Sequence, residues 1–150
     1  MSKIVLTYGT FDLFHVGHLR LLERARALGD SLIVGVSTDE FNIVKGKKTF
    51  IEFCHRIEIV RSLRCVVAVF PETCWEQKRN DVARYKADIF TMGSDWTGKF
   101  DSLKDQCEVL YLPRTENISS TELRARLANP NAIQTQHIHG DQNLCSSPDR

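Results

Sequence analysis

Two histidines that flank a glycine, in the segment His15-Val16-Gly17-His18, are the residues of this chain best suited to chemistry. Residues three apart on the first turn of a helix lie on one face, so both imidazole rings can point an N–H group at a single target. A glycine lets a ligand approach the backbone closely, and the first amides of a helix have no partner within the helix. Together these features predict a binding site for a polyphosphate.

The same turn lacks the signatures of the two common phosphate-binding loops. No Gly-x-Gly-x-x-Gly is present, which argues against a dinucleotide cofactor, and no Gly-Lys-Ser or Gly-Lys-Thr, which argues against a P-loop ATPase. A metal site is disfavoured too, because no third ligand has a matching spacing and no cysteine pair is set for zinc. A hydrogen-bonded helix cap is the structural alternative, and two histidines in one glycine-containing turn favour function over it.

A second group of phosphate ligands is predicted where the last strand leads into the last helix. Ser119 is a good N-cap and Glu122 completes a capping box, while Ser120 and Thr121 add hydroxyls beside the free amides. A helix cap alone explains this pattern equally well. With Arg114 on the loop that leaves the strand, however, the group becomes a second phosphate clamp facing the histidine turn.

These segments need a scaffold, and the hydrophobic pattern predicts an α/β one. Apolar, β-branched runs alternate with helical segments, and strands that are apolar on both faces are typical of a parallel sheet. We expect a single domain with a doubly wound, Rossmann-like parallel sheet, whose ligand crevice lies at the carboxyl ends of the strands. The predicted strands are 4–7, 32–36, 66–70, 89–92 and 109–112. The first predicted helix begins at the histidine turn, carries an apolar stripe from Leu19 to Leu28 and ends at Gly29, and the others are about 53–63, 75–85 and 119–129.

Composition narrows the possible partners. Lys and Arg number 20 against 19 Asp and Glu, so the chain lacks the positive excess that holds a nucleic-acid polymer or an anionic membrane. No apolar run approaches the ~20 residues of a membrane span and no signal peptide is seen, which predicts a cytoplasmic protein. Five cysteines without a Cys-x-x-Cys pair predict reduced thiols, mostly small core residues. Residues 130–150 are polar, and we expect a disordered tail or an arm that crosses to another element.

The motifs resemble those of a known group of enzymes. His15-Val16-Gly17-His18 after Gly9-Thr10-Phe11-Asp12 is similar to the HxGH signature of the nucleotidylyltransferase superfamily, and Ile118-Ser119-Ser120-Thr121 is similar to its second hallmark. The likeness to the glycerol-3-phosphate cytidylyltransferase family goes further and runs from about Ile4 to Leu127. Its segments are residues 8–13, 37–42, 75–78, 92–93, 95–96, 98–101 and 112–116.

This resemblance implies an activity and its partners. A cytidylyl group would pass from CTP to sn-glycerol 3-phosphate by in-line attack on the α-phosphate, giving CDP-glycerol and pyrophosphate. The resemblance also implies Mg²⁺ bound mainly through the CTP phosphates, a homodimer, and a cytidylyltransferase domain over residues 1–129. The product would feed wall teichoic acid, a capsule or another glycan, and the sequence does not choose among them.

The resemblance also assigns roles to single residues. The catalytic residues would be His15, His18, Lys47 and Arg114. The nucleotide contacts would be Thr10, Phe11, His15, Gly17, His18, Lys47, Arg64, Asp95, Arg114, Thr115, Ser119, Ser120 and Thr121. The acceptor contacts would be Asp12, Asp39, Lys45, Arg56 and Lys78. Of these, Lys45 and Lys78 would meet the acceptor's phosphate, and the two aspartates would contact substrate or order the loops.

Three departures from the family pattern leave alternatives open. Val67 and Ala68 stand where the family usually carries an acidic residue, Asn117 stands in place of a glycine, and Ser94 replaces an aspartate. The change at Val67 bears on dimer contacts and rate more than on the type of reaction. The alternatives are nucleotidyl transfer to another polyol or sugar phosphate, and a catalytically silent nucleotide-binding regulator.

Overall fold

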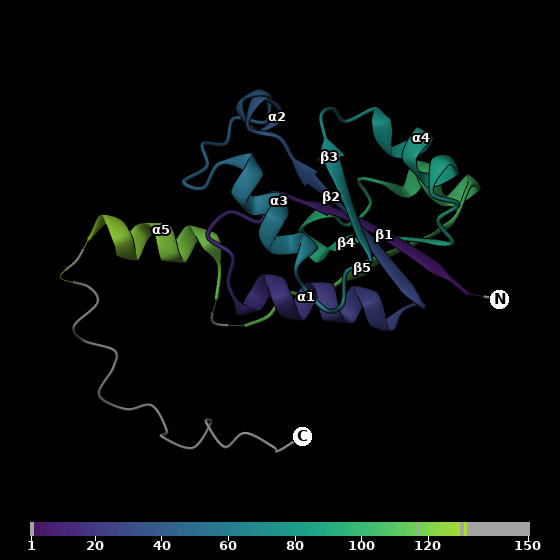
Figure 1. The fold of residues 1–150 in the computed structure, drawn as a ribbon, viewed down its shortest axis with the longest axis horizontal. Coiled ribbons are helices and arrows are strands. Elements are labelled where there is room, and N and C mark those ends of the chain that lie inside the picture. The colour runs from purple at the N-terminus through teal and green to yellow at the C-terminus, as the bar shows by residue number, and fades with distance from the viewer. Residues whose placement is uncertain (1, 117, 130, 132–150) are drawn as a thin grey trace, which may run out of the picture. The chain divides into compact units, whose positions relative to one another are not determined.

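The computed structural model describes residues 2–116, 118–129 and 131, and a five-stranded parallel sheet forms its centre (Figure 1). The strand order is β3-β2-β1-β4-β5, and every neighbouring pair runs parallel. This confirms the predicted doubly wound α/β fold. The strands are β1 (Ile4–Gly9), β2 (Ser31–Ser37), β3 (Ala68–Glu72), β4 (Ile89–Gly93) and β5 (Glu108–Leu112). The helices are α1 (Val16–Ala27), α2 (Asp39–Val44), α3 (Phe53–Arg61), α4 (Gln77–Arg84) and α5 (Ser120–Ala128), with 3-10 helices η1 (Ser94–Trp96) and η2 (Asp101–Asp105).

The strand order reverses between β1 and β4, which are neighbours in the sheet although they are far apart in the sequence. Val5 of β1 pairs with Ile89 of β4, and on its other side with Leu32 of β2. In doubly wound proteins, ligands bind at the carboxyl ends of the strands where the order reverses. The loops that follow Gly9 and Gly93 are therefore the places where a site is expected.

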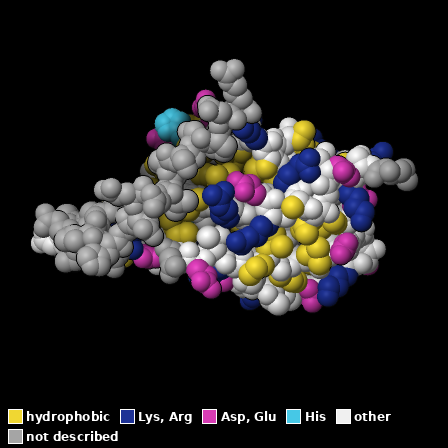
Figure 2. Space-filling view, turned by 90° about the horizontal axis from the view of Figure 1, so that it is seen from below, with side chains coloured by type: hydrophobic (Ala, Val, Ile, Leu, Met, Phe, Trp, Pro, Cys, Tyr) yellow, Lys and Arg dark blue, Asp and Glu magenta, His cyan; other side chains and the backbone are white. Residues whose placement is uncertain are grey.

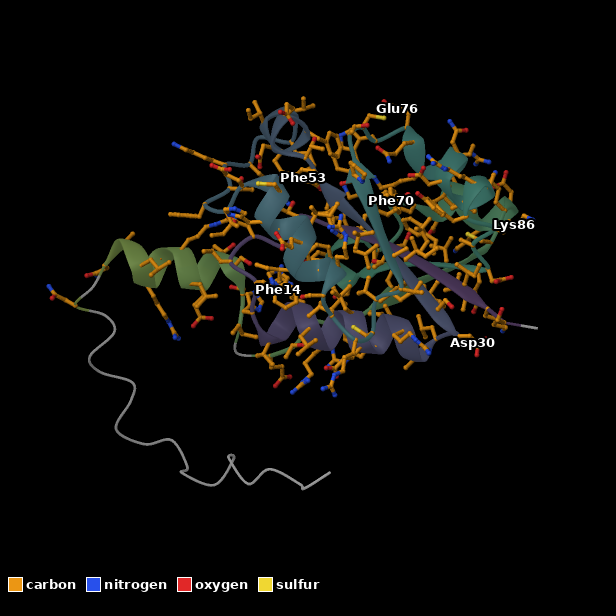
Figure 3. All side chains as sticks on the ribbon, viewed as in Figure 1. Phe14, Asp30, Phe53, Phe70, Glu76 and Lys86 are labelled. Atoms are coloured by element: carbon orange, nitrogen blue, oxygen red, sulfur yellow. The ribbon has the colours of Figure 1, made fainter. Side chains whose placement is uncertain are left out.

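Helices cover both faces of the sheet, and each face has its own hydrophobic core. α1 and α3 pack on one face, where Leu22 and Val60 are buried against the strands. α4 and η2 cover the other face, where Val82 is buried. Phe53 on α3 packs against the first core and Phe70 on β3 belongs to the second (Figure 3). The sheet is thus apolar on both sides, as its continuous β-branched runs predict.

Several elements differ from the prediction, among them the 3-10 helices η1 and η2, which were not expected. α2 was not expected, although Thr38 caps it by accepting a hydrogen bond from the amide of Phe41, and Asp39 and Glu40 occupy its first turn. β3 begins two residues later than predicted, because the chain turns after α3 with the amide of Val66 donating to the carbonyl of Leu63. β3 includes a proline, which its position at the sheet edge allows.

None of the four cysteines that the structure describes is fully buried, so the expectation that most cysteines are core residues is wrong for these four. Among the described positions, Cys54 is exposed and Cys65, Cys74 and Cys107 are half-buried. All four lie in turns or at the ends of elements, and of these Cys65 and Cys107 pack against the margins of the two cores. As expected, all four are free thiols.

Residues up to Ser120 form one compact unit, which contains the entire sheet, and residues from Thr121 onward form a second one. In the second unit, Arg126 pairs with Glu122 along α5 at 2.6 Å. The predicted boundary at residue 129 stays a prediction, and the polar segment 130–150, apart from Asn131, lies outside the described residues.

Among the described residues, no helix is long and apolar enough to cross a membrane. The face that lies at the bottom of Figure 1 mixes hydrophobic side chains with side chains of both charges (Figure 2). This view agrees with the near balance of 20 basic and 19 acidic residues in the sequence.

Candidate functional site

The loop after β1 is held in an unusual backbone conformation around Asp12. Phe11 and Leu13 have φ angles of 55° and 49°, in the left-handed region that residues with a side chain rarely adopt. The Asp12 carboxylate accepts hydrogen bonds of 2.9 Å from the amides of Phe50 and Ile51. Asp12 is buried, so its role in this structure is to join two loops, which is one of the two roles proposed for it from the sequence.

His15 and His18 begin α1 as a capping box made of two imidazoles. The backbone amide of Gly17 donates to Nδ1 of His15 at 3.0 Å, and the amide of His15 donates to Nδ1 of His18 at 3.2 Å. A ring nitrogen that accepts a hydrogen bond carries no proton, so in the neutral rings the proton is on Nε2. The cap therefore fixes the tautomer of both histidines.

Burial keeps both rings neutral. It lowers the pKa of His18 to about 3, with a further lowering from His15 and an opposing effect of Asp12. Burial also lowers the pKa of His15. At neutral pH the two histidines are thus uncharged hydrogen-bond donors through Nε2.

The two Nε2 atoms converge on one point, which the hydroxyl of Ser120 marks. They lie 3.3 Å and 3.4 Å from Ser120 Oγ, and this hydroxyl is 3.1 Å from the Asp12 carbonyl, to which it donates. The imidazole rings are stacked, with their centroids 3.9 Å apart. A helix cap and a convergent pair of donors therefore coexist, because the cap uses Nδ1 and both Nε2 atoms face the Ser120 hydroxyl.

Gly17 is required for a reason other than the expected close approach of a ligand. A Cβ atom at this position would lie 2.7 Å from Cε1 of His15 and 3.0 Å from Cγ2 of Ile118. Any side chain here would push the His15 ring out of its place over the helix start. Glycine thus serves the geometry of the histidine, and the predicted close approach of a ligand at Gly17 stays a prediction.

A second polar cluster lies at the carboxyl ends of β2 and β3. Glu72 ends β3, and its carboxylate accepts from Lys78 Nζ at 2.5 Å and from Ser37 Oγ at 2.5 Å. Lys45 Nζ donates to Ser37 Oγ at 2.8 Å and lies 3.6 Å from the carboxylate. The side chains of all three charged residues are at most 7% exposed. The structure thus brings together Lys45 and Lys78, the two predicted acceptor-phosphate contacts.

Aromatic rings surround these two ammonium groups. Lys78 Nζ lies 4.6 Å from the centroid of the Tyr8 ring and 5.0 Å from that of Trp75, and Lys45 Nζ lies 4.7 Å from that of Phe41. Ring faces attract cations in desolvated sites. Burial nevertheless lowers the pKa of Lys45 to about 8, an effect that Glu72 opposes and that Lys47 and Lys78 reinforce.

Arg56 and Asp39 form an ion pair that connects the loops after β1, β2 and α2. Arg56 is buried, and its guanidinium donates to the carbonyls of Thr10, Ser37 and Ile51 at 2.7 to 2.8 Å and to Asp39 Oδ1 at 2.8 Å. Asp39 also accepts from the amide of Phe53 at 3.0 Å, and these partners hold its carboxyl pKa low against the raising effect of burial. With so many donors engaged, Arg56 holds loops together, whereas direct contact with the acceptor was expected.

Asp95 and Arg114 pair with each other on the surface, after β4 and β5. Arg114 Nε donates to Asp95 Oδ2 at 2.9 Å, with a second contact from Nη2, and both side chains are more than half exposed. Nearby in the sequence, the Thr115 hydroxyl oxygen is buried without a hydrogen-bond partner. Two predicted nucleotide contacts are thus paired here, and a third is left unsatisfied.

The remaining predicted residues fall into three groups. Thr10 donates to Asn42 at 3.0 Å and Phe11 is buried, so both belong to the loop after β1. Lys47 is exposed on the loop after α2, and Ser119 is half-buried just before Ser120. Thr121 belongs to the second compact unit, and its predicted contact stays a prediction.

Arg64 is the predicted residue that the fold separates from the histidine turn. It precedes β3, and β3 pairs with β2 from Ile33↔Ala68 to Ser37↔Glu72, so Arg64 lies at the amino edge of the sheet. The histidines follow β1 and lie at the carboxyl edge. A strand of five residues spans about 17 Å, so Arg64 does not reach the nucleotide site of its own chain.

Sequence reasoning missed Glu72 and Ser37. A carboxylate that ends an apolar strand run, opposite a serine that ends the neighbouring run, was a usable signal, because carboxyl ends of parallel strands meet at one edge. For metals, the described residues contain no group of three or more His, Cys, Asp and Glu that could hold an ion.

Comparisons with known proteins agree on one family. A family model described as cytidylyltransferase-like matches residues 6–126. Glycerol-3-phosphate cytidylyltransferase from Bacillus subtilis (strain 168) is 56% identical over 126 residues, which are 84% of this chain and 98% of the relative. The enzyme of the same name from Staphylococcus aureus (strain NCTC 8325 / PS 47) is 52% identical over 130 residues, 87% of this chain and 98% of the relative.

Solved structures agree on the fold alone. The lipopolysaccharide core biosynthesis protein from Thermoplasma volcanium GSS1 is 23% identical with a TM-score of 0.66, covering 77% of this chain and all of that one. A putative nicotinate-nucleotide adenylyltransferase from Vibrio parahaemolyticus is 17% identical with a TM-score of 0.60, covering 87% of this chain and 89% of that one.

Proposed function

Because the chain belongs to the glycerol-3-phosphate cytidylyltransferase family, we propose that it transfers the cytidylyl group of CTP to sn-glycerol 3-phosphate. The products are CDP-glycerol and pyrophosphate. The observation that carries this proposal is that two clusters of phosphate ligands, the histidine pair and the lysine pair, lie at the same carboxyl edge of the sheet. A reaction between two phosphate-bearing substrates needs one such cluster for each.

The chemistry needs no strong general base. A phosphate oxygen of glycerol 3-phosphate attacks the α-phosphorus of CTP, and this oxygen is already ionised near neutral pH. The bond from the α-phosphorus to the bridging oxygen breaks, and pyrophosphate leaves. Catalysis then depends on alignment of the two phosphates and on stabilisation of the charge that builds on the transferred group.

The histidine pair supplies that stabilisation in our proposal. The Nε2–H groups of His15 and His18 donate to the α- and β-phosphates at the point that Ser120 Oγ marks. Their tautomer and position are set by the helix cap before the substrate arrives, so little reorganisation is needed in the transition state. Neutral donors also avoid trapping the product pyrophosphate as strongly as fixed positive charges would.

Positive charge comes from residues that face solvent. We propose that Lys47 and Arg114 bind the departing phosphates, with the hydroxyls of Thr115 and Ser119 as further ligands. Arg114 would exchange its partner Asp95 for phosphate, which leaves the Asp95 carboxylate free to contact the base. CTP would enter as its magnesium complex, in which the phosphates hold Mg²⁺.

We also propose a homodimer in the cytoplasm, without a nucleic-acid polymer or membrane partner. Two apolar side chains near Arg64 support the dimer, since Val67 is 66% exposed and Ile59 is 40% exposed. A partner copy that covers them would bury both side chains. Light scattering of the purified chain measures the mass directly, and a monomer at micromolar concentration would contradict the dimer.

Product identification tests the function. The chain is incubated with Mg²⁺ and each of CTP, ATP, GTP and UTP, together with sn-glycerol 3-phosphate, its enantiomer, phosphoethanolamine or a pentitol phosphate, and the products are identified by phosphorus NMR. CDP-glycerol and pyrophosphate in equal amounts are expected from CTP and sn-glycerol 3-phosphate. A better rate with another acceptor would change the substrate, and binding of CTP without any product would favour the silent regulator.

A further inference from the structure

Glu72 is the described side chain whose burial and contacts the proposed reaction does not yet explain. It is 2% exposed at the end of β3, and its carboxylate contacts Lys78, Ser37 and, at 3.6 Å, Lys45. Nothing in the HxGH signature or the second hallmark includes it. A buried carboxylate between two buried lysines is costly to place, so a role beyond packing is expected.

We propose that Glu72 is a positioning residue for the acceptor: it holds the ammonium groups of Lys45 and Lys78 in place and keeps Lys45 charged, so that both can bind the phosphate of the acceptor. This inference rests on the proposed function. Glu72 does not itself contact the substrate in this proposal, because its oxygens are occupied by the lysines and by Ser37.

The surroundings of the two ammonium groups support this role. Among the described residues, Glu72 is the carboxylate within ion-pair distance of either of them. Four ring faces also lie near Lys78, at 4.6 to 6.0 Å from its Nζ atom, and they belong to Tyr8, Phe41, Trp75 and Phe100. Ring faces attract a cation but do not fix its position as a charged hydrogen bond does. Without Glu72, two positive charges would share this pocket with no counter-ion.

The charge balance of the cluster suits an anionic ligand. Two ammonium groups and one carboxylate leave one positive charge before the acceptor binds. A phosphate dianion then finds two donors already held in place, and the positive charge is not fully neutralised in advance. A second carboxylate would cancel the attraction, whereas none would leave the lysines repelling each other.

Lys45 is the member of the cluster that responds to pH. Glu72 faces it from β3, Lys78 from α4, and Lys47 from its own loop. Burial and the two lysines lower the pKa of Lys45, and Glu72 raises it, with a net value of about 8. Removing the charge of Glu72 must therefore lower this pKa further.

The test compares the pH dependence of kcat/KM for glycerol 3-phosphate in the parent and in Glu72→Gln, at saturating CTP. The basic limb of this profile reports the pKa of groups in the enzyme form that meets the acceptor. In the parent we expect a decline above pH 8. In Glu72→Gln we expect the decline to begin about one pH unit lower, with kcat/KM about tenfold lower at pH 8 and kcat within about threefold. The kcat/KM for CTP should keep its profile.

Two further variants separate positioning from a general structural role. Asp81→Asn removes another buried carboxylate, which accepts from Tyr8 and Gln77, and should lower stability without moving the basic limb. Ser37→Ala removes the hydroxyl that bridges Lys45 and Glu72, and should move the limb in the same direction as Glu72→Gln but less. Ser37→Ala decides the question if Glu72→Gln does not fold.

The outcomes distinguish this inference from the proposed function. If the parent makes no CDP-glycerol, the proposed function fails, whatever the variants do. If the parent makes it and both Glu72→Gln and Ser37→Ala keep the parental profile for the acceptor, only the role of Glu72 is refuted. A shift of equal size in the CTP profile would also refute it, because it would mean that the whole site is disturbed.

Discussion

The histidine pair and the lysine cluster, the two phosphate sites that we propose, are built by different physical means, although both lie at the carboxyl edge of one sheet. His15 and His18 are neutral, their protons are placed by backbone hydrogen bonds, and burial removes their charge. Lys45 and Lys78 are buried cations, and the carboxylate of Glu72 lies within ion-pair distance of both. The histidine pair is thus a fixed pair of neutral donors, and the lysine cluster is a set of two cations and one carboxylate.

This difference matches the tasks proposed for the two clusters. The α-phosphate of CTP changes its charge distribution during the reaction, so donors that are rigid and uncharged favour the transition state over the ground state. The acceptor's phosphate must be captured and aligned, and full charges give stronger binding in a water-poor pocket. The nucleotide cluster should therefore control kcat, and the lysine cluster should control KM for the acceptor.

The largest effect is expected when the Nε2 donors are removed without losing the helix cap. Asparagine carries its oxygen where histidine has Nδ1 and has nothing at Nε2, so His15→Asn and His18→Asn keep the cap. Each should reduce kcat about a hundred- to a thousandfold, or ~3–4 kcal/mol of transition-state stabilisation. Steady-state kinetics measure kcat, titration calorimetry measures the affinity for CTP, and a melting curve measures the stability of each variant.

The alanine variants provide the matched control for the cap. His15→Ala and His18→Ala lose both functions, so they should show the same loss of kcat and a further ~1 kcal/mol loss of unfolding free energy. If His15→Asn turned over within a few-fold of the parent, the histidines would be helix caps alone, and the distinction between the two clusters would disappear.

A smaller effect is expected from Lys78→Met, and it should appear in kcat/KM for glycerol 3-phosphate. This substitution removes one of the two ammonium groups, so kcat/KM for glycerol 3-phosphate should fall about 10- to 100-fold while KM for CTP changes little. Loss of the partner at 2.5 Å leaves Glu72 with Lys45 and should also destabilise the protein by about 3 kcal/mol. Steady-state kinetics with each substrate varied in turn measure the effect on glycerol 3-phosphate separately from the effect on CTP.

Arg79→Met is the control for Lys78→Met on the same helix. Arg79 pairs with Asp105 at 3.0 Å on the surface, and both side chains are about half exposed, so its loss should change stability by less than about 1 kcal/mol and leave both KM values unchanged. An equal rise in both KM values for Lys78→Met would mean that the lysine cluster does not serve the acceptor alone.

The smallest effect is expected from Gly17→Ala, which displaces a histidine without removing it. The new Cβ would lie 2.7 Å from the His15 ring, so the ring must shift and kcat should fall about tenfold. Stability should change little, because alanine favours the helix by about 1 kcal/mol over glycine, which offsets the weakened cap. Parental kcat with normal stability would show that the position of the His15 ring is not critical.

The hydrophobic pattern was enough to predict the strands of the sheet, but not the exact residues at which each strand begins and ends. The runs in β1, β2, β4 and β5 are apolar on both faces and were placed within two residues. β3 lies at the edge, with Ala68 exposed, so its pattern is weaker and its start was misplaced. α2 has only six residues, too few for a periodic stripe to be seen, and its Thr38 cap was the one available signal.

The site was predictable where a motif is local, and less so where residues meet through the fold. His15 and His18 are three residues apart, so their convergence followed from helix geometry alone. Glu72 and Lys45 are brought together by pairing of β2 with β3, which no local pattern contains. The burial of Arg56 and its hydrogen bonds to three backbone carbonyls arise from tertiary packing. The sequence does not show these contacts, so Arg56 was expected to bind the substrate. Gly17 was assigned to the ligand because its contact with the His15 ring was not visible in the sequence.

The most direct test of the difference between the clusters is a nitrogen NMR titration of the full chain, labelled at histidine and lysine. Between pH 5 and pH 9, His18 should remain neutral with its proton on Nε2, because its pKa is about 3, and His15 should become charged only below its ordinary pKa, because burial lowers it. Lys45 should titrate near pH 8 in the same samples. Single-residue variants assign the signals. Histidines that become charged near their ordinary pKa of about 6.5, or a Lys45 that titrates near its ordinary value of about 10.4, would contradict the account.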